Sequence, residues 1–200
     1  MYYWRQLTDV QRQEAVDYRR IQRFPKHSPP HFDFDGENRY IITAACYEHI
    51  PIIAKTHIRL TDCESKILAA CEKHGSEIYA WCVLPNHYHV LIKTAVIKLL
   101  RKELGLVHGR LSFAWNGEDG SRGRQVWHNC FERKIRGGRH FFASLNYVLN
   151  NAVHHGYAEK WQDWQWSNAE AYLQQVGPER AAEIWHEYPV KNYGSKWDIY

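Results

Sequence analysis

The chain has 200 residues, which suits one domain with additions and is long enough to bury a substantial core. Its formal net charge of +4 permits a nucleic-acid partner without requiring one, and its nine Trp and thirteen Tyr suit both a core and surfaces that stack on unpaired bases. No apolar leader and no apolar run of membrane length occur, so a secretory signal and a membrane partner are not expected; we expect a soluble, cytoplasmic protein.

The five cysteines are odd in number and form no C-x-x-C pair, so we expect reduced thiols that serve mainly in packing. One alternative is a structural zinc site. Its ligands would be His57, Cys63, Cys71 and His74, although this spacing fits no familiar zinc pattern.

Residues 1–35 are predicted to form an N-terminal helical and irregular arm. Thr8 and Gln11 give a capping-box pattern at the start of a helix that ends near Arg20, and three prolines then break the chain. The arm is basic, which indicates either a solvated face or contact with a phosphate backbone. A central domain is expected over 36–157, and a C-terminal tail that packs on it over 158–200.

The central domain is predicted to have α+β class and a ferredoxin-like split βαββαβ order. β-prone runs predict strands over 39–47, 78–84, 87–93 and 126–135, the second and third forming a hairpin. Apolar spacing predicts helices over 62–74, capped by Thr61 and stopped by Gly75, and over 97–104, ended by Gly105 and followed by a glycine-rich connector. The order of elements gives an antiparallel sheet, and an added C-terminal helix runs over 139–156.

The third strand carries two histidines, His87 and His89, that project to the same face because side chains alternate along a strand. Tyr88, between them, points the other way. Two neutral imidazoles side by side can chelate a metal. The alternative is a strand whose wet face happens to carry two polar residues.

The last helix supplies a possible third ligand. Tyr147 and Asn151 are four residues apart and share one helix face. If this face lies over the histidines, Asn151 can complete a mixed nitrogen and oxygen site suited to Mg²⁺ or Mn²⁺, and Tyr147 can point at whatever the metal holds. The alternative is a core tyrosine followed by a polar residue at a helix end.

Positive charge is concentrated over 101–139, where nine Lys or Arg stand against four acids, a net charge of +5. Such a segment is expected to contact a nucleic-acid backbone, although a solvated surface gives the same count. The candidate DNA-binding residues are Arg101, Lys102, Arg110, Arg122, Arg124, Arg133, Lys134, Arg136 and Arg139.

Several blocks together resemble the REP-associated tyrosine transposases, which are relatives of single-strand insertion-sequence transposases in the HUH endonuclease superfamily. The blocks occur in the order that the family has. They are Ala80–Ile92 (AWCVLPNHYHVLI), Gly123–His128 (GRQVWH), Arg139–Phe141 (RHF), Asn146–Tyr157 (NYVLNNAVHHGY) and Asp163–Ser167 (DWQWS).

The resemblance implies that 36–157 is an HUH transposase-like catalytic domain. It implies that His87 and His89 bind the metal, that Tyr147 is the nucleophile and that Asn151 is the polar ligand one turn further on. The sequence departs from the family pattern at two positions. The residue between the histidines is usually small and aliphatic, but here it is Tyr88. The residue after the asparagine is often proline, but here it is Ala152, which lets the helix continue. Asn150 is the fallback ligand, about 100° away around the helix.

The activity implied is cleavage and rejoining of single-stranded DNA at a hairpin, a REP-like palindrome, through a 5′-phosphotyrosine, by a monomer or a homodimer. Exposed aromatics could stack unpaired bases, although each is also a candidate core residue. The alternative function is a non-catalytic protein that binds single-stranded DNA or RNA hairpins on the same fold. The candidate stacking residues are Trp115, Trp164 and Trp166.

Overall fold

The structure is a computed structural model that describes Thr8, Val10, residues 38–191 and Tyr193. The chain divides into one unit formed by 1–35 with Tyr200 and a second formed by Gly36–Ile199, and the second is described below. The helix and proline-rich arm predicted near the N-terminus lie outside the described residues. Within the described part, no helix is both long enough and apolar enough to cross a membrane.

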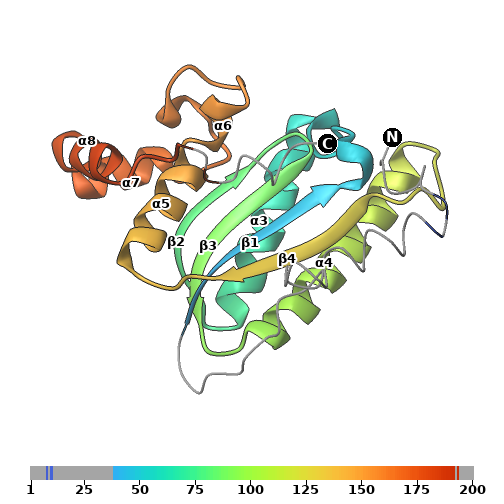
Figure 1. Cartoon of the computed structure of the whole chain (residues 1–200). Helices are drawn as coiled ribbons and strands as arrows, with labels where there is room; N and C mark the ends of the chain where they lie inside the picture. The colour runs from blue at the N-terminus through green and yellow to red at the C-terminus, as the bar shows by residue number, and fades with distance from the viewer. Residues whose placement is uncertain (1–7, 9, 11–37, 192, 194–200) are drawn as a thin grey trace. The chain divides into compact units, whose positions relative to one another are not determined.

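Four strands form one antiparallel sheet in the order β2-β3-β1-β4 (Figure 1). The strands are β1 (Asn38–Cys46), β2 (Glu77–Val83), β3 (His87–Thr94) and β4 (Trp127–Lys134). The order places β3 between β1 and β2, and β1 between β3 and β4. This is the ferredoxin-like split βαββαβ arrangement that the sequence predicts, and the predicted hairpin of β2 and β3 is confirmed.

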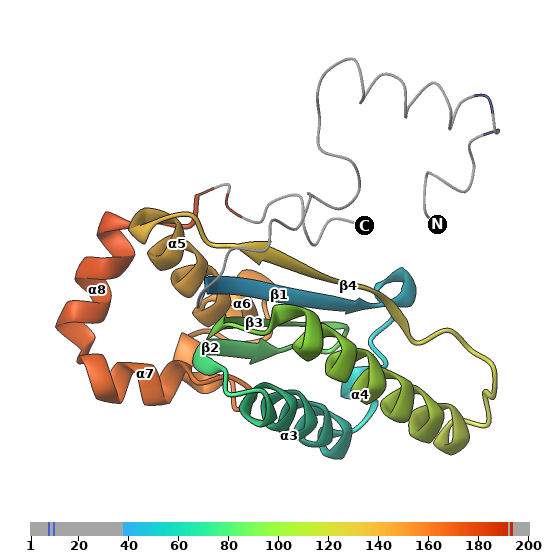
Figure 2. The same ribbon diagram turned by 90° about the horizontal axis from the view of Figure 1, so that it is seen from below.

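The sheet separates two layers of helices (Figure 2). One face packs on α3 (His57–Lys73) and α4 (Ile97–Glu118), and the other on α5 (Gly138–Leu149) and α6 (Asn151–His154). The core beside α5 is extended by α7 (Ala169–Val176) and α8 (Pro178–Glu187). Three short 3₁₀ turns complete the elements: η1 (Tyr47–His49), η2 (Ile53–Lys55) and η3 (Trp161–Asp163).

Helix α3 begins one turn earlier than predicted. Its N-cap is Thr56, whose hydroxyl accepts a hydrogen bond from the Arg59 amide at 3.2 Å, whereas the Thr61 hydroxyl donates to the His57 carbonyl inside the helix. The predicted cap at Thr61 is therefore wrong. The predicted stop is confirmed, because Gly75 follows the helix with a φ of +61°, a left-handed conformation that favours glycine.

Helix α4 does not end at Gly105, as predicted, but continues through Gly105 and Gly109 to Glu118. Each helical glycine costs about 1 kcal/mol relative to alanine. Burying a large apolar side chain contributes about 1.5–3 kcal/mol, so the buried residues Leu104, Leu111 and Trp115 outweigh Gly105 and Gly109 in the helix interior. The predicted connector shortens accordingly to residues 119–126.

A buried ion-pair network closes the end of α4. Arg59 and Asp119 each have a side chain that is 4% exposed, and they meet at 2.6 Å. Lys55 and Arg124 also donate to the Asp119 carboxylate, at 2.6 and 2.8 Å. The Arg59 guanidinium and these two cations hold the pKa of Asp119 well below its usual range.

The two edges of the sheet differ. Along β2, the backbone amide of Val83 donates to the Trp166 carbonyl at 2.8 Å, and the amide of Trp81 donates to Asn168 Oδ1 at 2.9 Å. Residues that follow α6 thus cover the β2 edge. In the described part of the chain, no strand pairs with the outer edge of β4.

Candidate active site

Alternate residues of β3 face the two different layers. His87 and His89 point toward α5 and are 1% and 0% exposed. Tyr88 is buried in the opposite core, where its hydroxyl lies 3.0 Å from His108 Nε2. The prediction that the pleat turns Tyr88 away from the two histidines is confirmed.

The α5–α6 segment carries Tyr147 and Asn151 over the histidines. The Tyr147 hydroxyl lies 3.3 Å from His89 Nε2, and Asn151 Oδ1 lies 3.1 Å from His87 Nε2. Both side chains are buried. The structure therefore brings together the four residues that the sequence selected as catalytic and metal-binding.

The helix predicted over 139–156 is divided at Asn150, which has φ −88° and ψ 0° and separates α5 from α6. The backbone bonds continue on both sides of the division, since the amide of Asn150 donates to the Asn146 carbonyl at 3.0 Å and the amide of His154 donates to the Asn150 carbonyl at 2.9 Å. Helical spacing is thus kept from Tyr147 to Asn151. Asn151, rather than the fallback Asn150, is the residue that contacts His87.

Asn86 determines which nitrogen of His87 carries the proton. The Asn86 side-chain amide donates to the His49 carbonyl at 3.0 Å, which directs its oxygen to His87 Nδ1 at 2.7 Å. An amide oxygen can only accept, so Nδ1 of His87 is the protonated nitrogen. In the neutral ring, Nε2 then carries no proton, and it faces Asn151.

The lone pair of His87 Nε2 and the Oδ1 oxygen of Asn151 are two acceptors 3.1 Å apart, while Asn151 Nδ2 is buried with no hydrogen-bond partner among the described residues. A cation bound between the two acceptors would remove the repulsion between their lone pairs. Two ligands that are each about 2.1 Å from an octahedral Mg²⁺ and at right angles are about 3.0 Å apart. A half turn of the amide would let Nδ2 donate to the same lone pair when no cation is bound. The residues present therefore fit a small divalent cation that accepts both nitrogen and oxygen ligands.

The second histidine is also held from behind. Thr43 lies directly opposite His89 in the register of β1 and β3, and its hydroxyl is 2.7 Å from His89 Nδ1. The remaining ring nitrogen, Nε2, faces Tyr147. Each histidine thus has Nδ1 bound to a protein oxygen and Nε2 directed at the site, an arrangement typical of metal-ligating histidines.

Tyr193 packs beside Tyr147, with ring centroids 5.6 Å apart. The amide of Arg136 donates to His140 Nδ1 at 3.1 Å, so His140 Nε2 carries the proton and donates to the Tyr193 hydroxyl at 3.0 Å. That hydroxyl also bonds to Ser144, one helical turn before Tyr147 on α5. Burial lowers the pKa of His140, so this chain of donors persists with a neutral ring.

Sequence reasoning missed four neighbours of the site: Thr43, Asn86, His155 and Tyr193. His155 packs its ring 4.9 Å from that of His87 and was detectable, because it lies four residues after Asn151. Asn86 was detectable as the residue that precedes His87. Thr43 and Tyr193 carry no sequence signal, since strand register and the path of the tail bring them in.

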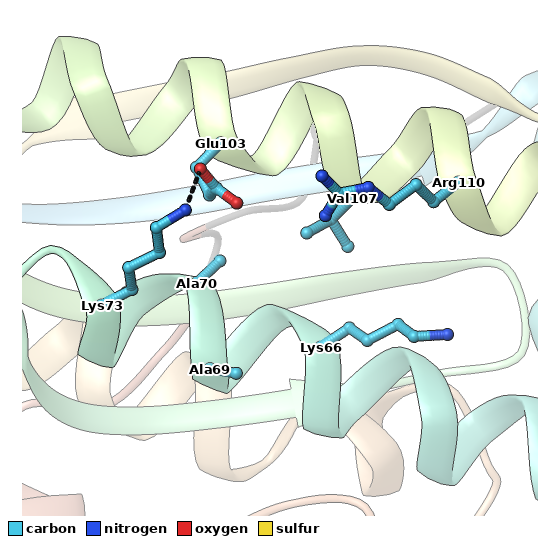
Figure 3. A pocket seen from close by; sticks show the side chains of 7 residues that line it. All are labelled: Lys66, Ala69, Ala70, Lys73, Glu103, Val107 and Arg110. Carbon is cyan, nitrogen blue, oxygen red and sulfur yellow. Dashed lines mark hydrogen bonds and ion pairs between the residues drawn. The ribbon is translucent and has the colours of Figure 1, made fainter.

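The predicted basic residues divide between the two sides of the sheet. Arg101, Lys102 and Arg110 belong to α4, on the side opposite the histidines. Arg101 pairs with Glu132 at 2.9 Å. Arg110 lines a groove between α3 and α4 together with Lys66 and Lys73 (Figure 3).

Other predicted basic residues have structural partners or lie near the site. Arg124 donates to Asp119, and Arg122 stacks on Phe113 with its guanidinium 4.2 Å from the ring centroid. Lys134 lies opposite Tyr40 in the register and so faces α4. The remaining three lie from the end of β4 to the start of α5, on the side of the histidines: Arg133, Arg136 and Arg139.

The stacking prediction is wrong for Trp115, which is 1% exposed in the core beside α4. Trp164 and Trp166 are half-buried, and their indole nitrogens donate to the Val83 carbonyl at 2.9 Å and to the Thr61 hydroxyl at 3.1 Å. Both tryptophans therefore tie the segment after α6 to the sheet and to α3.

The zinc alternative is not supported. Cys63 and Cys71 are 0% exposed in the core, and burial raises the pKa of the Cys71 thiol to about 12. Among the described residues, no group of three or more His, Cys, Asp or Glu side chains is arranged to hold a metal. The described cysteines are free thiols, as predicted.

Comparison with known proteins agrees with this picture. Over 136 residues, 57% of this chain and 73% of the relative, the sequence is 28% identical to a Haemophilus influenzae protein provisionally named a REP-associated tyrosine transposase. The fold matches a solved REP-associated tyrosine transposase bound to a REP hairpin, with a TM-score of 0.55 and 16% identity over 75% of this chain and 87% of that one. The resemblance to these transposases is confirmed.

Two further results complete the comparison. A provisionally assigned transposase of Deinococcus radiodurans aligns over 59% of this chain and 92% of its own, with 14% identity and a TM-score of 0.41, too weak a likeness to bear on fold or function. No protein-family model matches the chain.

Proposed function

We propose that this chain is a metal-dependent, single-tyrosine endonuclease and strand transferase that cleaves and rejoins hairpin DNA through a 5′-phosphotyrosine. The observation that carries the proposal is the meeting of the Tyr147 hydroxyl with His89 Nε2 at 3.3 Å, next to the contact of His87 Nε2 with Asn151 Oδ1 at 3.1 Å. The substrate class follows the relatives, one of which was solved with a REP hairpin. We therefore propose a single-stranded DNA that folds into a REP-like palindrome.

His87, His89 and Asn151 would hold the metal, Mg²⁺ or Mn²⁺, through two Nε2 atoms and one Oδ1 atom. When bound, the cation supplies charge stabilisation to the phosphate as it becomes pentavalent. Asn86 and Thr43 orient the two imidazoles by binding their Nδ1 atoms.

Tyr147 would attack the scissile phosphate. The Tyr147 O–P bond forms, the bond from phosphorus to the 3′-oxygen breaks, the phenolic proton leaves to solvent, and the 3′-oxygen takes up a proton. A phenol with the ordinary pKa of about 10 is a poor nucleophile at neutral pH, so exact placement of the hydroxyl matters. The ester stores the bond energy, which permits rejoining without a nucleotide cofactor.

The test uses a DNA hairpin with single-stranded flanks, taken from the DNA that adjoins the gene. Wild type and the Tyr147→Phe variant are incubated with it in Mg²⁺ or Mn²⁺, and covalent protein–DNA adduct is measured on denaturing gels. We expect a loss of more than about a thousandfold in Tyr147→Phe, because phenylalanine lacks the oxygen that would bond to phosphorus.

Tyr88→Phe is the matched control, since Tyr88 is the neighbouring buried tyrosine on the other face. It should form adduct normally while losing about 1 kcal/mol of stability with its hydrogen bond to His108. Adduct that persists in Tyr147→Phe would assign the nucleophile elsewhere. Hairpin binding without cleavage in either metal would favour the non-catalytic alternative.

A further inference from the structure

The face of the sheet that carries the histidines is not uniformly covered. Helix α5 packs on β2 and β3, and the core beside α5 takes few residues from β1 and none from β4. On β4 this face presents Asn129, Phe131 and Arg133, all of which are exposed. Strand β4, next to β1, therefore extends the site sideways as an accessible surface.

Strand register places one aromatic ring of this surface in line with the site. His89 lies opposite Thr43, and Thr43 lies opposite Phe131, so the three side chains form a single row across β3, β1 and β4. Adjacent strands are about 4.8 Å apart, so Phe131 is about 10 Å from His89. A base next to the scissile phosphate can reach that far.

Phe131 has the properties of a stacking residue. Its side chain is 47% exposed although it sits in the middle of a strand. The His128 ring stacks beside it, with centroids 6.2 Å apart and planes 27° apart. Two residues further along the same face, Arg133 supplies positive charge for the backbone, and the pKa of His140 is lowered in part by Arg133.

We propose that the exposed face of β4 is the track for the unpaired DNA strand, on which Phe131 stacks a base beside the cleavage position. The inference rests on the proposed function and adds the path of the substrate to it. An aromatic ring can stack on any base, and a neighbouring arginine can bind the phosphate. This surface would therefore add affinity for single strands without selecting a base sequence. A duplex has no free base faces and would not use it.

The test measures binding rather than cleavage, in the absence of metal. The probe is a twelve-residue thymidine oligonucleotide in which 2-aminopurine replaces one base, moved along the strand in successive probes. Stacking quenches its fluorescence. We expect quenching at one or two positions with wild-type protein, and in Phe131→Ala a loss of quenching and an affinity lower by about tenfold.

Phe113→Ala is the matched control, because Phe113 is also an exposed phenylalanine, 71% accessible, but lies on α4. It should bind like wild type. Phe131→Trp should retain quenching, and Phe131→Leu, which keeps bulk without a ring, should lose it. Equal affinity in Phe131→Ala and wild type, or equal losses in Phe131→Ala and Phe113→Ala, would overturn the inference.

Two further outcomes separate this inference from the proposed function. If Phe131-dependent quenching occurs in a protein that never forms a Tyr147 adduct, the track stands and the catalytic proposal fails. If adduct forms normally while the Phe131 variants bind like wild type, the track is wrong. The other possible occupant of this face is a second copy of the chain, and sedimentation of wild type and Phe131→Ala tests it. A dimer that dissociates only in the variant, with DNA binding unchanged, would assign this face to a second copy.

Discussion

Two buried tyrosine–histidine pairs lie on opposite faces of one sheet. On the α4 face, the Tyr88 hydroxyl is 3.0 Å from His108 Nε2, and on the α5 face the Tyr147 hydroxyl is 3.3 Å from His89 Nε2. His108 also stacks on Trp127, with centroids 4.2 Å apart. Burial lowers the pKa of His108 to about 4 and raises that of Tyr88, so both stay neutral.

The difference between the pairs lies in their neighbours. Tyr88 and His108 are surrounded by apolar and aromatic side chains and by the Cys130 thiol, which also interacts with the Tyr88 hydroxyl. His89 has a second histidine beside it, with ring centroids 5.0 Å apart, and an asparagine oxygen faces that histidine. A tyrosine–histidine contact alone therefore predicts packing. A second imidazole nitrogen that faces an amide oxygen beside it makes the contact a candidate for chemistry.

The largest contrast is expected from replacing one histidine on each face. His89→Ala should weaken Mn²⁺ binding by at least about a hundredfold and abolish metal-dependent cleavage, because it removes a ligand. His108→Gln should bind Mn²⁺ like wild type. Electron paramagnetic resonance of free Mn²⁺ measures both. Equal Mn²⁺ affinities in the two variants would contradict a metal site on the α5 face.

Substitutions on the α4 face should change the free energy of unfolding more than they change activity. Asp119→Ala should lower the free energy of unfolding by about 3–5 kcal/mol, because it leaves the buried Arg59 guanidinium without its main partner. Asp62→Ala is the control: its pair with Lys66 is exposed on α3, so we expect at most about 0.5 kcal/mol. Urea unfolding measures both free energies. Similar losses in the two variants would contradict the central role of Asp119 in the ion-pair network.

Thr43→Val tests whether the hydrogen bond with Thr43 positions His89 in the pair that His89 forms with Tyr147. The methyl group replaces the hydroxyl that binds His89 Nδ1, so we expect Mn²⁺ affinity to fall by about 10–100-fold with little change in fold stability. Thr43→Ser should restore the affinity. Nitrogen-15 spectra of the metal-free protein should show a changed tautomer of His89 in Val and not in Ser; an unchanged tautomer with full affinity would show that Thr43 has no positioning role.

Lowering the pH should affect the α4 pair through His108. Its pKa is about 4 in the fold and about 6.5 when unfolded, so the unfolded chain binds more protons between these values, and stability falls as the pH drops. From pH 7 to pH 5 the loss is about 2 kcal/mol. His108→Gln cannot titrate, so its stability should fall by that much less over the same range. Parallel pH profiles by urea unfolding would contradict this.

The sequence predicted the elements whose local pattern is strong. Alternation along β3 correctly separated His87 and His89 from Tyr88, and helical spacing correctly put Tyr147 and Asn151 on one side. Local signals failed where tertiary burial overrode them. Gly105 looks like a stop, yet the buried apolar residues of α4 carry the helix past it.

Charge and aromatic counts were weaker guides, because they carry no information on which face a residue occupies. The basic segment is contiguous in sequence, but the sheet separates Arg110 on α4 from Arg133 on β4. The row from His89 through Thr43 to Phe131 depends on two strand registers between segments far apart in the chain. No pattern within a single segment encodes such a row.

The turn before β3 is fixed from both sides. The amide of Leu84 donates to the His87 carbonyl at 2.8 Å, the Pro85 carbonyl accepts from the amide of Ile53 at 3.0 Å, and the Asn86 carbonyl accepts from that of Cys46 at 2.6 Å. Because side chains alternate, losing or gaining one residue here would exchange the two faces of β3. Tyr88 would then face Tyr147, and both histidines would enter the apolar core. The site thus depends on the length of this turn as well as on the Asn86 side chain within it.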